Sequence, residues 1–304
     1  MTADGTVEVS SPASSANLGP GFDALGLALE LRNTYAFAPG PRDHIEVTGK
    51  FAERIPVDPA RNLAFRAFRS VAPSDAGAYA LHAHRAIPSQ GGMGSSASAI
   101  VAGLVAANAT FGLNLSTEVL LAKSAEIEGH ADNVAPALLG GLVVTVADAG
   151  RIQSVRVPFP TEVGLVLIVP DYRVPTVRAR RVLPDLVPRK DAVANLARAA
   201  LLIAALQQGR YEVLRTATED FLHQPYRLEL NPALQPCMTA ALLAGAYGAA
   251  LSGSGPTILA FAPRDKNISI ATAMADACLA LGRRCESYVL GCAETGARVI
   301  TTAA

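Results

Sequence analysis

The feature that most constrains this chain is a glycine-rich turn that leads directly into a long apolar segment. Residues 88–98 read PSQGGMGSSAS, and apolar residues then recur at helical spacing up to Gly112. This pattern predicts a helix that begins at its serine caps and ends at the glycine. Such a turn exposes backbone N–H groups at the positive end of the helix dipole, and its glycines leave room for a close ligand. The segment predicts a phosphate site, with a turn that binds nothing as the alternative.

Two better-known phosphate loops must be compared with this turn. The P-loop requires a lysine and then Ser or Thr after its last glycine, whereas Gly94 is followed by Ser95. Residues 92–97 do fit the dinucleotide fingerprint G-x-G-x-x-A, so an NAD(P)-dependent oxidoreductase is an alternative function. Two observations argue against it. The preceding strand alternates with polar residues, and no acid ends a second strand about twenty residues further on.

Composition narrows the class of partner. The chain has 304 residues, of which half are hydrophobic, and it carries 26 basic and 26 acidic side chains. This balance offers no charge footprint for nucleic acid or for an anionic membrane surface, so we expect a small-molecule ligand. No segment approaches the roughly 18 consecutive apolar residues of a membrane span, and the N-terminus does not resemble a signal peptide, so we expect a cytoplasmic protein. The four cysteines lack a C-x-x-C pair and are expected to be reduced and buried.

Hydrophobic periodicity predicts a mixed α+β architecture in both halves of the chain. In the first half we expect strands at 6–10, 25–37, 44–49 and 79–88, an ordered loop at 11–23, and helices at 61–72, 95–112 and 117–128. In the second half we expect strands at 142–147, 152–157, 163–170 and 285–291, a strand, glycine turn and strand within 248–261, and helices at 191–209, 211–222, 233–245 and 270–282. The length favours two domains, 1–155 and 156–304, with the active site between them.

Three further segments carry polar or glycine-rich patterns. In residues 15–23, SANLGPGFD, Asn17 and Asp23 could bind a ligand or could stabilise a turn through their own backbone. In residues 126–133, EIEGHADN, a helix end delivers two glutamates into a loop with His, Asp and Asn. A single glutamate beside a phosphate loop suffices for Mg²⁺, while zinc would need softer ligands and better spacing. Residues 251–258 indicate a tight glycine turn and nothing more on their own.

Taken in chain order, four segments resemble the successive motifs of the homoserine kinase branch of the GHMP kinase superfamily: PASSANLGPGFDALGLAL, IPSQGGMGSSASAIVAGL, AEIEGHADNVAPALLGG and LSGSGPTILAF. Residues 176–184 and 223–227 extend the resemblance over nearly the whole chain. It implies a ribosomal-S5-domain-2-like N-terminal domain that binds ATP and a ferredoxin-like C-terminal domain. The implied activity is phosphorylation of L-homoserine to O-phospho-L-homoserine, in threonine biosynthesis. Another GHMP small-molecule kinase is the alternative.

The resemblance also implies residue roles. For ATP it implies Asn62 near the nucleoside and the backbone of Pro88, Ser89, Gln90, Gly91, Gly92, Met93, Gly94, Ser95, Ser96, Ala97 and Ser98 around the phosphates. For Mg²⁺ it implies Ser96 and Glu126, with Glu128 as the competing carboxylate. For L-homoserine it implies Asn17, Asp23, His130, Asp132 and Asn133 around the amino and hydroxyl ends, and Arg180 and Arg227 at the carboxylate.

Two of these residues are expected to take part in the chemistry. Asn133 would orient the hydroxyl toward the γ-phosphorus, and Asp23 is the one candidate for a general base. The sequence does not decide whether a base exists, nor the oligomeric state, for which a homodimer is one option.

Overall fold

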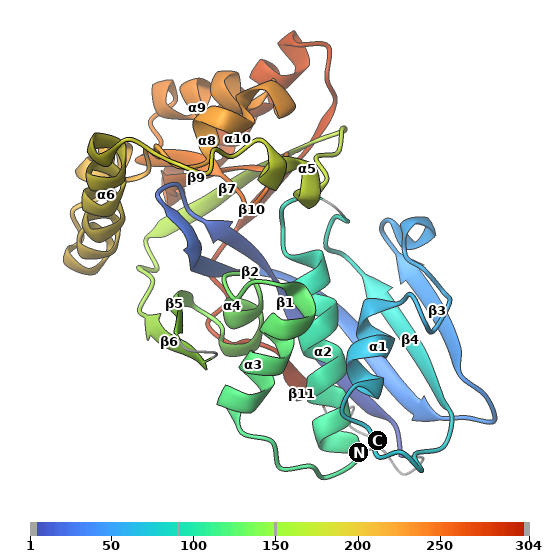
Figure 1. The fold of residues 1–304 in the computed structure, drawn as a ribbon. Helices are drawn as coiled ribbons and strands as arrows, with labels where there is room; N and C mark the ends of the chain where they lie inside the picture. Colours follow the sequence, from blue (N-terminus) through green and yellow to red (C-terminus); the bar gives the residue numbers. More distant parts are fainter. Residues whose placement is uncertain (1–4, 90, 149–150, 301–304) are drawn as a thin grey trace.

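The computed structural model of the chain describes residues 5–89, 91–148 and 151–300 and contains two β-sheets (Figure 1). The first sheet has seven strands: β1 (Val7–Asn17), β2 (Gly21–Pro39), β3 (His44–Gly49), β4 (Tyr79–Arg85), β5 (Leu142–Asp148), β6 (Arg151–Val157) and β11 (Arg298–Ile300). Their order is β11-β1-β2-β4-β3, and β5 pairs with a different part of β2 and with β6. Among these pairs only β3 and β4 run parallel.

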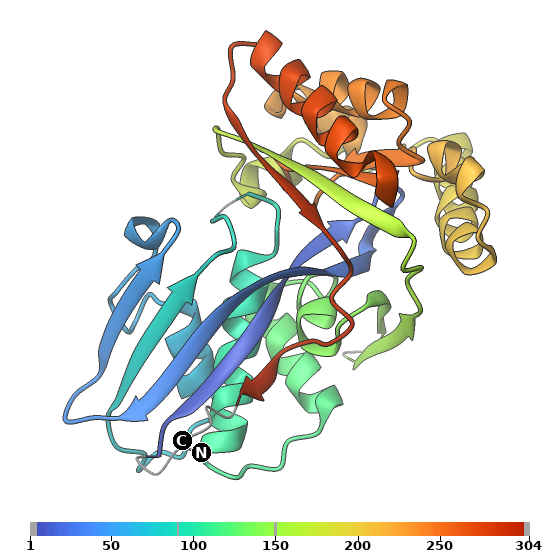
Figure 2. The same ribbon diagram turned by 180° about the vertical axis from the view of Figure 1, so that it is seen from behind.

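Four helices cover one face of the first sheet, and Figure 2 shows the opposite face from behind. These helices are α1 (Leu63–Arg69), α2 (Ser95–Thr110), α3 (Thr117–Glu128) and α4 (Val134–Leu139). The short 3₁₀ turn η1 (Ala52–Arg54) precedes them. The helices predicted at 95–112 and 117–128 are confirmed, with ends that differ by at most two residues.

The second sheet is antiparallel and has the order β10-β7-β9-β8. Its strands are β7 (Val163–Pro170), β8 (Gly248–Leu251), β9 (Ile258–Pro263) and β10 (Cys285–Leu290). The helices of this half are α5 (Thr176–Arg181), α6 (Arg189–Gln208), α7 (Leu214–Ala217), α8 (Gln224–Arg227), α9 (Leu234–Leu243) and α10 (Asn267–Ala280), with 3₁₀ turns η2 (Tyr211–Val213), η3 (Leu228–Leu230) and η4 (Arg264–Lys266). None of the helices described here has the length and apolar character needed to cross a bilayer.

The chain crosses between the sheets twice. Strand β6 ends in the first sheet at Val157, and β7 begins the second at Val163. After β10 the chain returns, and β11 pairs with β1 (Figure 2). The division into domains 1–155 and 156–304 stays a prediction, and the predicted α+β mixture of helices and sheets is confirmed.

The loop predicted at 11–23 is mostly strand, which corrects the sequence interpretation. β1 continues to Asn17 and β2 begins at Gly21, so only residues 18–20 form the turn. The serines of this segment misled the prediction, because every residue from Val9 to Asn17 is buried and no polar face marks the strand. Two of their hydroxyl groups have side-chain partners: Ser14 Oγ donates to Asn133 Oδ1 at 2.9 Å, and Ser15 Oγ lies 2.8 Å from Ser252 Oγ.

The amphipathic helix predicted at 211–222 was wrong. The structure has η2 and the single turn α7 there, followed by a bend. The carboxylate of Asp220 explains the break. It accepts hydrogen bonds from the backbone N–H groups of Leu222, His223 and Gln224, and such a side chain competes with continued helix.

Helices α1 and α2 pack closely because Gly103 has no side chain. A Cβ at this position would lie 2.1 Å from the carbonyl oxygen of Ala64 and 2.9 Å from the amide nitrogen of Phe68. Both neighbours are backbone atoms of α1 and cannot rotate away. Gly103 therefore sets the separation of the helix that begins at the glycine turn from its neighbour.

We predict that Gly103→Ala lowers the free energy of unfolding by about 1–3 kcal/mol, because the added methyl group overpacks the contact. Urea unfolding monitored by circular dichroism measures the change. Gly77→Ala is the matched control, since nothing lies within 4 Å of a Cβ there. Equal effects of the two substitutions would contradict the close contact.

Candidate functional site

A cavity of about 530 Å³ opens where the two halves of the chain meet. Residues from the first sheet, from the glycine turn, and from α5, α8 and the 252–257 loop all line it. Most of the residues predicted for the site lie on its wall: Asn17, Asp23, Asn62, Ser89, Gly91, Gly92, Gly94, Ser95, Ser96, His130, Asp132, Asn133, Arg180 and Arg227. Sequence segments that are far apart therefore converge on one cavity.

Four predicted residues of the glycine turn do not line the cavity, and one cannot be placed. Pro88, Met93, Ala97 and Ser98 are buried in the protein, where they support the turn. Gln90 lies outside the described residues. The remaining positions of the turn face the cavity at the first turn of α2, as a site for an anion requires.

Two glycines of the turn are required by the fold itself, through their backbone conformation and their close neighbours. Gly92 and Gly94 have φ values of 80° and 62°, which favour glycine. A Cβ on Gly94 would lie 1.9 Å from Ser14 Oγ, and one on Gly92 would lie 2.4 Å from the carbonyl oxygen of Ser252. At these two positions the sequence interpretation, room for the ligand, needs correction. The glycines are required because other protein segments approach the turn.

The 252–257 loop locks the glycine turn to the second sheet. Ser252 Oγ donates to the carbonyl oxygen of Gly92 at 2.6 Å, and the amide of Thr257 donates to Gly91 at 3.2 Å. The amide of Gly253 donates to the carbonyl oxygen of Ala16 in β1 at 3.0 Å. This loop, which the sequence indicated only as a tight turn, holds three elements of the site together.

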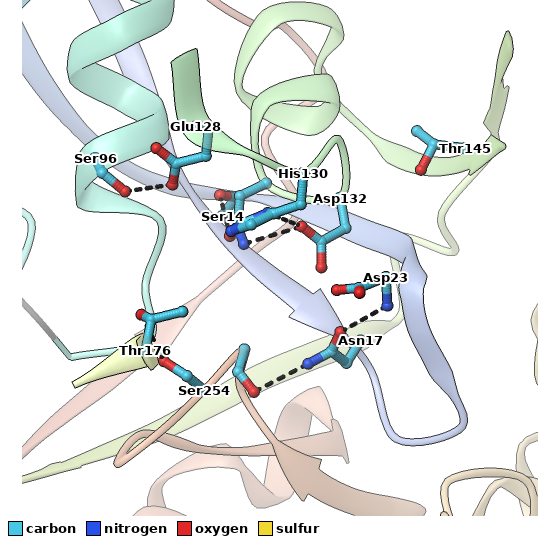
Figure 3. Close-up of polar contacts among 12 residues, drawn as sticks. Ser14, Asn17, Asp23, Ser96, Glu128, His130, Asp132, Thr145, Thr176 and Ser254 are labelled. Atoms are coloured by element: carbon cyan, nitrogen blue, oxygen red, sulfur yellow. Dashed lines mark hydrogen bonds and ion pairs between the residues drawn. The ribbon is translucent and has the colours of Figure 1, made fainter. Parts of the chain in front are cut away.

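Asn17 holds the turn between β1 and β2 in place. Its φ is 71°, and its side chain donates to the carbonyl oxygen of Gly253 at 3.0 Å while accepting from the amide of Asp23 at 3.1 Å (Figure 3). Asn17 is 3% exposed. Both readings of this residue, ligand binding and turn stabilisation, therefore apply to one side chain, which lines the cavity and also fixes the turn.

The structure places Glu128, rather than Glu126, at the glycine turn. Ser96 Oγ donates to Glu128 Oε1 at 2.5 Å, and Glu128 lines the cavity (Figure 3). Burial raises the pKa of Glu128, while the hydrogen bond from Ser96 works in the opposite direction. Glu126, the first choice from the resemblance, is exposed and does not line the cavity. The physical reason is the helical period, which turns residues 126 and 128 to different faces of α3.

His130, Asp132 and Asn133 form one hydrogen-bonded chain, and Figure 3 shows His130 and Asp132 beside Glu128. His130 Nδ1 lies 2.5 Å from Asp132 Oδ1, and Asn133 Nδ2 donates to the same oxygen at 3.3 Å. Ser14 Oγ donates to Asn133 Oδ1 at 2.9 Å and thereby fixes the orientation of the amide. Burial opposes protonation of His130, but its hydrogen bond to Asp132 and the charge of that carboxylate raise the pKa.

Arg180 and Asp23, which come from opposite halves of the chain, form an ion pair on the cavity wall. The guanidinium of Arg180 donates to both carboxylate oxygens of Asp23, at 2.9 and 2.8 Å. This fork raises the pKa of Arg180. A carboxylate is thus already bound where the resemblance expects the carboxylate of the substrate.

Arg227 is held more deeply. It is 2% exposed, and it donates from Nε to the carbonyl oxygen of Ala179 at 3.1 Å and from Nη1 to that of Gly253 at 3.1 Å. Burial lowers its pKa to about 10, and the charge of Arg180 adds to this shift. The ring of Phe22 lies within 6 Å of both the Arg180 and the Arg227 guanidinium groups.

The structure also gives Asn62 a structural role. Its Oδ1 accepts from the amide of Phe65 and caps α1, and its Nδ2 donates to the carbonyl oxygen of Pro56. The side chain lines the cavity with these groups already paired. A nucleoside at this wall would therefore contact Asn62 mainly by van der Waals packing, since the amide group already has its hydrogen-bond partners.

Sequence reasoning missed several residues of the site. Ser14, which orients Asn133, stood in a segment taken as a loop. Phe22, Arg85, Thr176 and Ser254 line the cavity, and Thr176 and Ser254 share a 3.3 Å hydrogen bond across its rim. No single residue type signals such positions. The sequence offers one indication of them, which is that they lie within or next to the predicted motifs.

No group of three or more His, Cys, Asp or Glu side chains within residues 5–89, 91–148 and 151–300 is placed to hold a metal ion. Ser96 and Glu128 nevertheless offer two hard oxygen donors beside the glycine turn. Such a pair suits Mg²⁺, which keeps several waters and takes further oxygens from phosphate.

Comparisons with known proteins agree with this geometry. Residues 62–141 match the family described as GHMP kinases N terminal domain, and residues 202–279 match GHMP kinases C terminal. A homoserine kinase of Desulfitobacterium hafniense is 41% identical over 297 residues, which cover 97% of this chain and all of the relative. A homoserine kinase of Carboxydothermus hydrogenoformans is 44% identical over 84% of this chain and 85% of the relative.

Solved structures extend the similarity to the fold. The crystal structure of a homoserine kinase from Cytophaga hutchinsonii has a TM-score of 0.88 and 28% identity, and 99% of each chain is covered. The mevalonate kinase of L. major in complex with R-mevalonate has a TM-score of 0.71, with 93% of this chain and 95% of that chain covered, but only 16% identity, which supports the fold alone.

His223 generates a prediction on pH. This fully buried residue donates from Nε2 to the carbonyl oxygen of Gly19 and accepts from Arg227 at Nδ1, and burial lowers its pKa to about 4. Its folded-state pKa lies below the unfolded value of about 6.5, so its contribution to stability is present above pH 6.5 and is lost as the pH falls toward 4.

Between pH 7 and pH 5 we expect the wild type to lose about 2 kcal/mol more unfolding free energy than His223→Gln, which lacks the titrating group. Urea unfolding at both pH values measures each loss. Parallel losses in the two proteins would show that His223 does not titrate as its burial requires.

Proposed function

The chain belongs to the homoserine kinases of the GHMP kinase superfamily, and on that premise we propose that its central cavity binds ATP and L-homoserine side by side. The reaction transfers the γ-phosphoryl group of ATP to the side-chain hydroxyl and yields O-phospho-L-homoserine, a step of threonine biosynthesis. The observation that supports this use of the cavity is its lining. The glycine turn at α2 and the Asp23–Arg180 pair face the same space.

The ATP end is the wall formed by the glycine turn and Asn62. Backbone N–H groups at the first turn of α2 suit phosphate oxygens, and the helix dipole adds to the attraction. Ser89, Gly91 and Ser95 line this wall together with Asn62. The nucleoside would lie against Asn62 and the phosphates against the turn.

The substrate end is the wall with Asp23, Asp132 and Arg180. L-homoserine carries an ammonium and a carboxylate, and this wall offers acids for the first and a guanidinium fork for the second. Asp23 and Arg180 are paired with each other in the structure. Binding of the zwitterion would therefore break this ion pair, and each side chain would then contact the oppositely charged group of the substrate. Arg227 would support the part of the wall that binds the carboxylate, because it donates to the carbonyl oxygens of Ala179 and Gly253 and so holds their segments in place.

Ser96 and Glu128 would hold the Mg²⁺ ion that accompanies ATP. Bound there, the ion neutralises charge that develops on the transferred phosphoryl group. The 2.5 Å hydrogen bond between the two side chains already brings both oxygens to one point of the cavity wall. Glu128 replaces Glu126 in this role because only Glu128 faces the cavity.

Asn133 would orient the acceptor hydroxyl, since Ser14 fixes its amide and its side chain faces the cavity. Positioning of this kind supplies much of the rate in phosphoryl transfer, which requires little covalent chemistry from the protein. Asp23 is a poor general base while Arg180 holds both of its oxygens. A base role for Asp23 would require the substrate to release it first.

The function is tested by a coupled assay of ADP release. We expect release with L-homoserine at a kcat/KM at least about a hundredfold above that with mevalonate, galactose or shikimate, because only homoserine presents both charges to Asp23 and Arg180. Without an acceptor alcohol, release should be near background. Preference for one of the other alcohols would favour a different GHMP activity, and binding of NAD(P) without ATP turnover would favour an oxidoreductase.

The metal assignment is tested at the two glutamates. We expect Glu128→Gln to lower kcat on the order of a hundredfold or more at saturating ATP, because the neutral amide is a weaker Mg²⁺ ligand. Initial rates over a series of Mg²⁺ concentrations measure the effect.

Glu126→Gln is the matched control, since it makes the same chemical change two residues earlier on the exposed face of α3. It should change kcat by less than about twofold. A large loss at position 126 with none at position 128 would restore Glu126 as the metal ligand and contradict the geometry given above.

A further inference from the structure

Arg85 is a buried cation whose guanidinium group contacts both ends of the glycine turn. It is the last residue of β4 and is 3% exposed. Its Nη2 donates to Ser95 Oγ at 2.5 Å and lies 3.4 Å from Ser89 Oγ and from the carbonyl oxygen of Ile87. Ser89 stands near the start of the turn and Ser95 begins α2, so one guanidinium spans the turn.

The guanidinium of Arg85 has no anionic partner in the part of the chain that the structure describes. Among residues 5–89, 91–148 and 151–300, no carboxylate forms an ion pair with Arg85, and its Nε is buried without a hydrogen-bond partner. Burial of an uncompensated charge is costly, and a group of this kind is normally paired. The surroundings of Arg85 raise that cost. It contacts the N-terminal end of α2, where the helix dipole is itself positive.

The other arginines of the cavity show the contrast. Arg180 has the carboxylate of Asp23, and Arg227 has two backbone carbonyl oxygens and a histidine nitrogen. Arg85 has two hydroxyl groups and one distant carbonyl oxygen, none of them charged. Because Arg85 lines the cavity, an anion bound at the turn would come close to it and supply the missing charge.

We propose that Arg85 is a positioning residue for the phosphates of ATP, which holds both ends of the turn and compensates the phosphate charge. The inference rests on the ATP site proposed above and adds a determinant that the glycine turn lacks, a full positive charge. It implies that the free protein tolerates a poorly compensated cation and that phosphate binding relieves it. A merely structural arginine would instead stabilise the free protein and affect all ligands of the cavity alike.

The test measures dissociation constants for adenosine, ADP and ATP without Mg²⁺, together with the melting temperature of each free protein. Wild type is compared with Arg85→Met, Arg85→Lys and the control Arg66→Met, which removes an exposed arginine of α1. We expect Arg85→Met to weaken ATP binding about ten- to a hundredfold and ADP binding less, with adenosine changed by less than about twofold. Its melting temperature should fall by no more than about 3 °C. Arg66→Met should match wild type.

The variant Arg85→Lys separates the contribution of the positive charge from that of the guanidinium contacts with Ser89 and Ser95. It keeps the positive charge but not the planar group that reaches both serines, so it should recover most of the ATP affinity that the methionine variant loses. Failure of lysine to restore ATP affinity would overturn the proposal, as would a loss that is equal for adenosine and ATP. So would a methionine variant that does not fold or melts far below wild type. If wild type itself bound no ATP, the proposed nucleotide site would fail and this inference with it.

Discussion

The site depends on the hydrogen bonds that join the β1–β2 turn to the 252–257 loop across the two sheets. The side chain of Asn17 and the amide of Gly253 each make one of these bonds, and Ser252 carries the connection on to the glycine turn. Backbone carbonyl oxygens and small side chains make most of these contacts, so the separation is fixed within a few tenths of an ångström. These hydrogen bonds fix the position of each functional side chain, because none of the three segments can move without the other two.

Charge is distributed unevenly along the cavity that results. At one end, acids and arginines neutralise each other, as in the forked pair of Asp23 and Arg180. At the other end lie Arg85 and the first turn of α2, both positive. Glu128 accepts a hydrogen bond from Ser96 there, but no acid among the described residues binds Arg85. A zwitterion suits the first end and a polyanion the second. Electrostatics therefore supports the order of the two ligands proposed above, before any contact is considered.

The sequence predicted the parts of the site that lie in local patterns. The glycine turn and its helix were recognised because backbone requirements and helical spacing both act over a few residues. The resemblance then led to Asn17, Asp23 and Arg180, all of which line the cavity. Glu126 was preferred to Glu128 because their order along the chain does not say which one faces the turn.

The remaining errors share one cause, since they depend on contacts between distant segments. β1 was cut short because both of its faces are buried, which removes the alternation that marks a half-exposed strand. The glycines of the turn were assigned to the ligand, although Ser14 and Ser252 are what approach them. The sequence pattern of residues 79–88 does not single out Arg85, and its lack of a counter-ion among the described residues is visible only in three dimensions.

The return of β11 to the first sheet bears on how the chain acquires its structure during synthesis. Arg298, Val299 and Ile300 pair with Ser10, Val9 and Glu8, so an edge of the first sheet stays open until almost all the described residues have left the ribosome. The intervening strands of the second sheet emerge before that edge is closed. The N-terminal half therefore cannot complete its sheet as an independent unit during translation, and the closing contact has one of the longest sequence separations in the molecule. Completion of the first sheet is thereby coupled to synthesis of the half that supplies Arg180.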